Sequence, residues 1–235
     1  MNVRRSILVS ALVLVALAVS GPLAAQAQPT GSLAGMTAPQ PNVPEVFTLA
    51  GQYVRMAYNN EGYAVIGYRM VQEEVGNPWA LISVGVTLRG NTKDYTMPRE
   101  AFSLQTPDGK TLPLPTQKEY MKADVRALNM RAQKFNDNIN YFPVGQNRPC
   151  PIQFFANLSG PGLAFDTVEL STQRDCLGRL YFNVPGGIQE GQYFLNVKFE
   201  GGSLQVPFRV FTKEQAKDFA KQWEDLKKTH DASYK

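Results

Sequence analysis

Apolar residues alternate with polar ones over several short stretches, and this period of two is what most constrains the fold. Over residues 79–88 one face is apolar throughout, with Ala80, Ile82, Val84, Val86 and Leu88. Residues 193–199 and 204–210 repeat the pattern on either side of Gly201-Gly202, which predicts a hairpin. Because successive side chains of a strand point to opposite faces, each stretch predicts a strand with one buried face. Many short strands favour an all-β sandwich over the second possibility, a closed barrel.

Turn-forming residues separate the remaining predicted strands. Asn59-Asn60-Glu61-Gly62 separates an apolar stretch at 53–58 from one at 63–71, and we expect a hairpin there. Pro107-Asp108-Gly109 interrupts another alternating pair, and its glycine supplies the positive φ that a tight turn needs.

Two stretches change to a helical period. Over residues 117–136 the spacing predicts one inserted helix, begun by a Thr116 and Glu119 capping box. Its apolar stripe consists of Met121, Val125, Leu128, Ala132 and Phe135. Residues 212–235 predict a C-terminal amphipathic helix and tail with a second Thr-x-x-Gln cap. The apolar stripe of that helix consists of Ala216, Phe219, Ala220, Trp223 and Leu226.

The last predicted hairpin resembles the end of an immunoglobulin-like domain. Gly191-Gln192-Tyr193 at its start is similar to the tyrosine corner of that family, and 206–210 is similar to its final strand. Residues 79–114 resemble small immunoglobulin-like modules of exported bacterial proteins. The chain departs from the family in its inserted helix and in its cysteines, neither of which lies on the Tyr193 strand. The resemblance implies a sandwich over residues 45–211 and no particular activity.

The N-terminus predicts export. Residues 1–27 carry Arg4 and Arg5, an apolar run too short to span a bilayer, and an Ala25-Gln26-Ala27 close, as in a cleavable signal peptide. Residues 28–44 are rich in Pro and Gly, which is typical of a flexible linker. We therefore expect a periplasmic or secreted protein without a transmembrane segment in its mature chain.

Export affects how the two cysteines and the net charge are interpreted. Cys150 and Cys176 are expected to form a disulfide there, and a buried pair of thiols is the alternative. Without Arg4 and Arg5, the formal net charge falls from +4 to +2. A chain so nearly neutral gives little electrostatic support for binding nucleic acid.

Few residues could carry chemistry. His230 is the only histidine and lies in the predicted tail, which disfavours triad and zinc mechanisms. Asn136-Asp137-Asn138 lacks the sharp-turn glycine of a calcium loop and is interpreted as a helix end. The acidic candidates for a hydrolase show no paired spacing: Glu73, Glu74, Glu119, Asp124 and Asp166. No cofactor is predicted.

Aromatic residues give the remaining hypotheses. Tyr181 and Phe194 fall where a strand would place them on its outer face, which is either an exposed recognition surface or a face covered by other elements such as the helices. Phe219 and Trp223 lie on the terminal helix. Trp223 is expected either to dock that helix on the sandwich or to contact a partner. The leading interpretation is a non-enzymatic interaction module that binds an envelope or extracellular protein. The alternatives are a module that binds a sugar, lipid or peptide beneath the inserted helix, and a carboxylate-dependent hydrolase.

Overall fold

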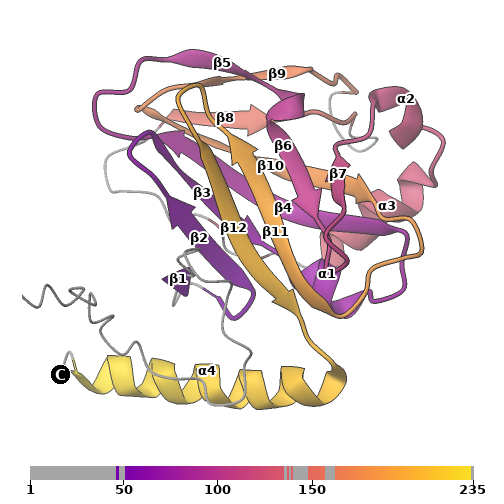
Figure 1. Ribbon diagram of the computed structural model, residues 1–235, viewed down its shortest axis with the longest axis vertical. Coiled ribbons are helices and arrows are strands. Elements are labelled where there is room, and N and C mark those ends of the chain that lie inside the picture. Colours follow the sequence, from indigo (N-terminus) through magenta and orange to yellow (C-terminus); the bar gives the residue numbers. More distant parts are fainter. Residues whose placement is uncertain are drawn as a thin grey trace, which may run out of the picture. The chain divides into compact units, whose positions relative to one another are not determined.

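The alternating stretches form two main β-sheets in the computed structural model (Figure 1). The structure describes residues 46–47, 51–134, 137, 139, 148–156 and 162–233. The chain divides into two compact units, residues 1–36 and 37–235, and every described residue belongs to the second. The predicted signal peptide and the predicted linker at 28–44 lie outside the described residues, as do residues 234–235. The backbone of His230 is described and is helical, but its side chain is not described.

The larger sheet has six strands. In spatial order they are β1 (Val46–Phe47), β2 (Val54–Tyr58), β3 (Gly62–Gly67), β4 (Trp79–Leu88), β10 (Arg174–Asn183) and β8 (Arg148–Ile152). All neighbours in this sheet are antiparallel except β10 and β8, which run parallel.

The smaller sheet has four antiparallel strands. In spatial order they are β12 (Ser203–Val210), β11 (Gly191–Lys198), β6 (Phe102–Gln105) and β7 (Thr111–Pro113). A short antiparallel pair, β5 (Tyr95–Pro98) and β9 (Thr167–Leu170), forms a separate ribbon. The hairpin predicted at Pro107-Asp108-Gly109 is confirmed, and Gly109 has a φ of 81°.

The core lies between the two sheets, as the alternation predicts. From the larger sheet, all five apolar residues of one β4 face, Ala80 to Leu88, are fully buried. From the smaller sheet, Tyr193, Leu195 and Val197 of β11 meet Val206 and Phe208 of β12. Burying one such aliphatic side chain contributes about 1.5 to 3 kcal/mol before the cost of ordering it. The sandwich prediction is therefore confirmed at the level of two packed, mostly antiparallel sheets.

The inserted helix predicted at 117–136 forms as two shorter helices. They are α2 (Gln117–Tyr120), which begins with the predicted capping box, and α3 (Val125–Lys134). The carboxylate of Asp124 accepts a hydrogen bond from the Ala127 backbone amide at 2.9 Å, so a second helix starts there. The break turns Met121 out of the expected stripe, and it is exposed.

The C-terminal helix α4 (Lys213–Ser233) forms where the sequence predicts it, with Thr212 and Gln215 as a reciprocal cap. Two further segments were not predicted, α1 (Arg69–Glu73) and the 3₁₀ turn η1 (Arg99–Ala101). The strand expected over 63–71 ends at Gly67, because the Gln72 amide bonds both backbone groups of Phe211 at 2.8 and 3.0 Å and holds α1 in place. None of the described helices has the length and apolarity needed to cross a membrane.

The predicted disulfide joins Cys150 on β8 to Cys176 on β10. The two residues are directly opposite in the parallel register, with Cα atoms 4.4 Å apart. The bond therefore ties the edge strand β8 to its own sheet, whereas the disulfide of antibody domains links two sheets.

Candidate interaction surfaces

Phe219 fixes the start of α4 against the sandwich. Its ring stacks on Phe211, with centroids 4.9 Å apart, and approaches Tyr53 at 6.4 Å. With 2% of its surface exposed, Phe219 serves docking within the chain and presents no ring to a partner.

A buried arginine lies beneath this contact. Arg55 of β2 shares the core-facing side of the strand with Tyr53, and its guanidinium carbon is 5.5 Å from the Phe219 ring centroid and 5.3 Å from that of Tyr68. The same group donates to the backbone oxygens of Gln52 and Val54. Arg55 was not predicted to be buried. Its inward direction could be inferred, because alternate residues of a strand share a face and the positions two before and two after it, 53 and 57, are apolar core positions.

The C-terminal half of α4 is exposed. Trp223 is half-buried, its indole nitrogen is buried without a hydrogen-bond partner, and the Lys227 ammonium lies 5.3 Å from its ring centroid. Leu226, the next residue of the same stripe, is 43% exposed. The apolar stripe of α4 thus continues beyond the part that Phe219 docks.

Of the two alternatives for Tyr181 and Phe194, exposure and coverage of their face, the structure shows coverage, because both side chains are buried. Tyr181 does point away from the inter-sheet core, but its ring packs on Tyr120 and Phe155 at centroid distances of 5.1 and 5.3 Å. Burial raises the pKa of the Tyr120 and Tyr181 hydroxyls. Phe194 is 3% exposed and stands in register between Gln105 and Pro207. Period-two parity gave the direction of these side chains correctly, but it could not show what covers them.

The space expected to hold a ligand beneath the inserted helix is filled by aromatic rings. Tyr120 at the end of α2 is fully buried among Tyr181, Phe155 and Trp79. A pocket that the described residues form lies elsewhere, beside the β6–β7 turn and Tyr193, with a volume of about 30 Å³. That volume suits a water molecule and is far below the roughly 300 Å³ of a small-molecule site.

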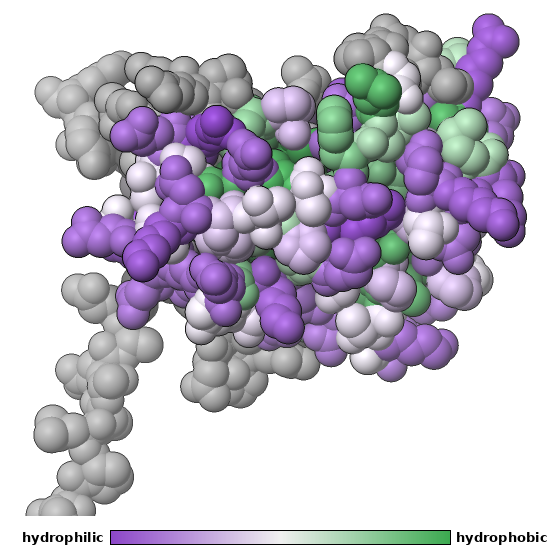
Figure 2. Space-filling model, turned by 90° about the horizontal axis from the view of Figure 1, so that it is seen from above, coloured by the Kyte–Doolittle hydropathy of each residue, from purple (hydrophilic) through white to green (hydrophobic). Residues whose placement is uncertain are grey.

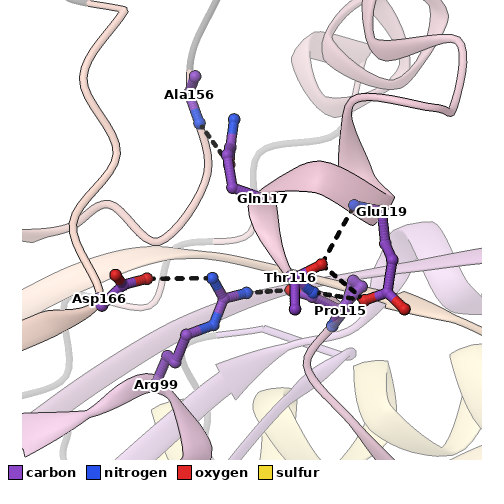
Figure 3. Close-up of polar contacts among 7 residues, drawn as sticks. All are labelled: Arg99, Pro115, Thr116, Gln117, Glu119, Ala156 and Asp166. Carbon is purple, nitrogen blue, oxygen red and sulfur yellow. Dashed lines mark hydrogen bonds and ion pairs between the residues drawn. The ribbon is translucent and has the colours of Figure 1, made fainter.

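Figure 3 shows a clamp built on Arg99. The buried guanidinium of Arg99 pairs with the Asp166 carboxylate at 3.3 Å, donates to the Pro115 carbonyl oxygen and lies 5.4 Å from the Phe155 ring centroid. Beside it, the Glu119 carboxylate accepts bonds from the Thr116 backbone and hydroxyl, and these bonds lower the pKa of Glu119. The contacts hold η1, the start of α2 and the segment before β9 together.

Four of the five carboxylates considered for a hydrolase have structural contacts. Asp166 pairs with Arg99, Glu119 caps α2, Asp124 caps α3, and Glu74 binds Arg131 at 2.7 Å. None of these contacts pairs one carboxylate with another. Within the described residues no three His, Cys, Asp or Glu side chains cluster at metal-binding distance.

The loop considered for calcium is described only in part. The carboxylate of Asp137 accepts a hydrogen bond from the Arg69 backbone amide at 3.0 Å, which supports the start of α1. Desolvation raises the pKa of Asp137. Its neighbours Asn136 and Asn138 lie outside the described residues.

A partly exposed cluster of two tyrosines and an arginine lies at the far end of β2. Tyr58 and Tyr63 face each other across the β2–β3 hairpin with ring centroids 5.6 Å apart. Arg89, the first residue after β4, places its guanidinium carbon 5.4 Å from both centroids. Tyr58 is 49% exposed. The sequence predicts the hairpin that pairs the tyrosines, but it gives no signal that Arg89 joins them, because that contact depends on the pairing of β3 with β4.

Apolar residues also gather on the surface near α2. Seen from the β5–β9 end, most of the surface is hydrophilic, and green residues concentrate on the side where Figure 1 places α2 (Figure 2). The exposed large apolar residues include Met121, Leu163 and Phe165. Leu163 and Phe165 lie on the segment between residue 162 and β9.

Comparison with protein-family models, with curated proteins and with solved structures finds no match to this chain.

Proposed function

We propose that the protein is an exported, non-enzymatic interaction module that contacts a protein partner in the cell envelope through the C-terminal half of α4. The observation that carries the proposal is the division of one apolar stripe. Phe219 docks the first half of the helix, whereas further along the same stripe Trp223 is half-buried and Leu226 is exposed. A partner with an apolar groove would bury these side chains, as in helix-in-groove recognition.

The sheet edges support contact through side chains. Strand addition by a partner needs an open edge with free backbone donors. In the two main sheets, three of the four edge strands carry proline: Pro113 in β7, Pro149 and Pro151 in β8, and Pro207 in β12. The fourth edge strand, β1, has two residues. A partner is therefore expected to bind the helix rather than extend a sheet.

The sandwich is, in this proposal, immunoglobulin-like. The order β12-β11-β6-β7 corresponds to strands G, F, C and C′ of that fold, and β3-β4-β10-β8 corresponds to A, B, E and D. The Tyr193 hydroxyl also bonds the backbone nitrogen and oxygen of Gln189 at 2.9 Å, the contact that defines a tyrosine corner. The parallel pairing of β8 departs from the family pattern.

The proposed location rests on the leader and the disulfide. A signal peptide at residues 1–27 would route the chain to the periplasm or the exterior, where a Cys150–Cys176 bond persists.

Affinity capture from native envelope extract tests the proposal. Leu226→Glu is the informative variant, because it places a charge in the exposed stripe without touching the docked Phe219. Lys221→Gln changes the net charge of α4 by the same amount and is the matched control. We expect a specific protein to co-purify with the wild type and the control and to be lost with Leu226→Glu. Capture of the same protein by all three forms would contradict a contact through this stripe.

A further inference from the structure

The cluster of Tyr58, Tyr63 and Arg89 is held in a fixed geometry. The Arg89 backbone amide donates to the Glu61 carbonyl oxygen at 2.8 Å, which ties the end of β4 to the β2–β3 hairpin. The Thr92 hydroxyl contacts the carbonyl oxygens of Arg89 and Glu61 at 2.7 and 3.2 Å. Gly90 allows the turn between them, with a φ of 62°. Because these contacts already order the backbone of Arg89, binding costs no further backbone entropy there.

The Arg89 guanidinium has no polar partner in the described part of the chain. Arg99, Arg131 and Arg174 each bind a carboxylate, at 3.3, 2.7 and 3.0 Å. Arg89 instead lies over two aromatic rings. The nearby Glu61 carboxylate accepts from the Gly201 backbone amide with both oxygens at 3.0 Å. The donors of Arg89 are thus left for a group outside these residues.

We propose that Tyr58, Tyr63 and Arg89 form a carboxylate-binding site that docks an acidic segment of a protein partner. A guanidinium held on aromatic rings presents a planar fork that matches a carboxylate, and two phenol hydroxyls beside it are further donors. Tyr and Arg are also the residues that most often dominate binding energy at protein interfaces.

This site is independent of the proposed contact through α4. Tyr53, which contacts Phe219, immediately precedes β2, whereas Tyr58 is the last residue of the same strand. The two surfaces therefore lie at opposite ends of β2, and a variant in one leaves the other intact.

Titration of the purified protein with an N-acetylated, C-amidated hexaglutamate peptide, followed by NMR of the arginine side-chain Nε–Hε signals, tests the proposal. We expect the Arg89 signal and the rings of Tyr58 and Tyr63 to shift in a saturable way, and a hexaglutamine peptide to leave them unchanged. Arg89→Gln should raise the Kd at least about tenfold. Arg126→Gln, which removes an exposed arginine from α3, is the matched control and should change the Kd less than about twofold.

A second variant separates geometry from charge. Thr92→Val keeps the guanidinium but removes the hydroxyl that holds the turn, and it should weaken hexaglutamate binding. The melting temperature of the variant is measured as a control for folding. Absence of saturable shifts up to about 10 mM peptide, the mM range being the weak limit of specific binding, would overturn the proposal. So would an equal loss of affinity in Arg89→Gln and Arg126→Gln, or equal affinity for inorganic phosphate and hexaglutamate.

Discussion

At the scale of single residues, buried polar atoms decide how firmly each segment is fixed. Gln72, Arg55 and Tyr193 all satisfy backbone groups from inside the sandwich. The role of Tyr193 could be predicted from the Gly-x-Tyr pattern, because a tyrosine at the start of such a hairpin has a known backbone partner. The role of Gln72 could not, because its backbone partner, Phe211, is far away in the sequence. For Arg55, the parity of its position indicates an inward side chain, but its contact with the Phe219 ring depends on how α4 packs.

Tyr193→Phe should lower the free energy of unfolding by about 1 to 3 kcal/mol. The variant keeps the ring in the core but removes the hydroxyl that bonds both backbone groups of Gln189. Urea denaturation measures the change. Tyr63→Phe is the control, because the Tyr63 hydroxyl has no hydrogen bond within the described residues and should change stability by less than about 0.5 kcal/mol. Equal losses of stability in the two variants would contradict a stabilising role of the Tyr193 hydroxyl.

Asp108 should titrate well below a normal aspartate. Hydrogen bonds from Lys110 and Thr106 lower the pKa of its carboxyl from 3.8 to about 2. Because the folded-state pKa is the lower one, the stabilisation is present above pH 3.8 and is lost as the pH falls toward 2. Carboxyl ¹³C NMR should show this value, and Lys110→Met should move the pKa back toward 3.8. An ordinary pKa in the wild type would mean that the turn contacts do not persist in solution.

At the scale of elements, helix ends were predicted better than helix continuity. The capping residues Thr116 and Thr212 both act as the sequence indicates. The single helix over 117–136 was wrong, because Asp124 offers its carboxylate to a new first turn. Period alone could not show this, because a helical spacing of apolar residues does not reveal whether the backbone is continuous between them.

Phe219→Ala should loosen α4 without unfolding the sandwich. Removing the ring takes away its contacts with Phe211, Tyr53 and Arg55, and comparable buried truncations cost about 3 to 5 kcal/mol. Hydrogen exchange should therefore become faster in α4 than in β11 and β12. Leu226→Ala, on the exposed part of the stripe, should leave exchange in the docked first half of α4 close to that of the wild type. Unchanged exchange of α4 in Phe219→Ala would show that another contact docks the helix.

The disulfide should stabilise the fold through its loop. Replacing both Cys150 and Cys176 with alanine opens a link between residues 26 apart, which is worth roughly 3.5 kcal/mol in the chain-entropy model. Urea denaturation of the double variant, compared with the wild type under reducing and non-reducing conditions, measures the loss. A loss below about 1 kcal/mol would mean that pairing with β10 alone holds β8 in place.

At the scale of the whole molecule, the strand pattern was sufficient to predict the sandwich, but it was not sufficient to predict which surfaces are exposed. Parity along β4, β11 and β12 predicts which residues meet in the core, because a one-residue slip would expose them all. The sequence left open whether Tyr181 and Phe194 are exposed, because what covers them comes from other segments, as Tyr120 at the end of α2 covers Tyr181. Both candidate surfaces, the end of α4 and the Tyr58 cluster, depend on contacts between segments far apart in the sequence.

The most direct test of the central claim is site-specific photo-crosslinking in the native cell. A photo-activatable amino acid replaces Leu226 in one variant and the exposed Thr111 of β7 in another. We predict a discrete crosslinked protein at position 226, none at position 111, and loss of the product when Trp223→Glu is added. No product at position 226, or the same product at both positions, would contradict a function through the exposed half of α4.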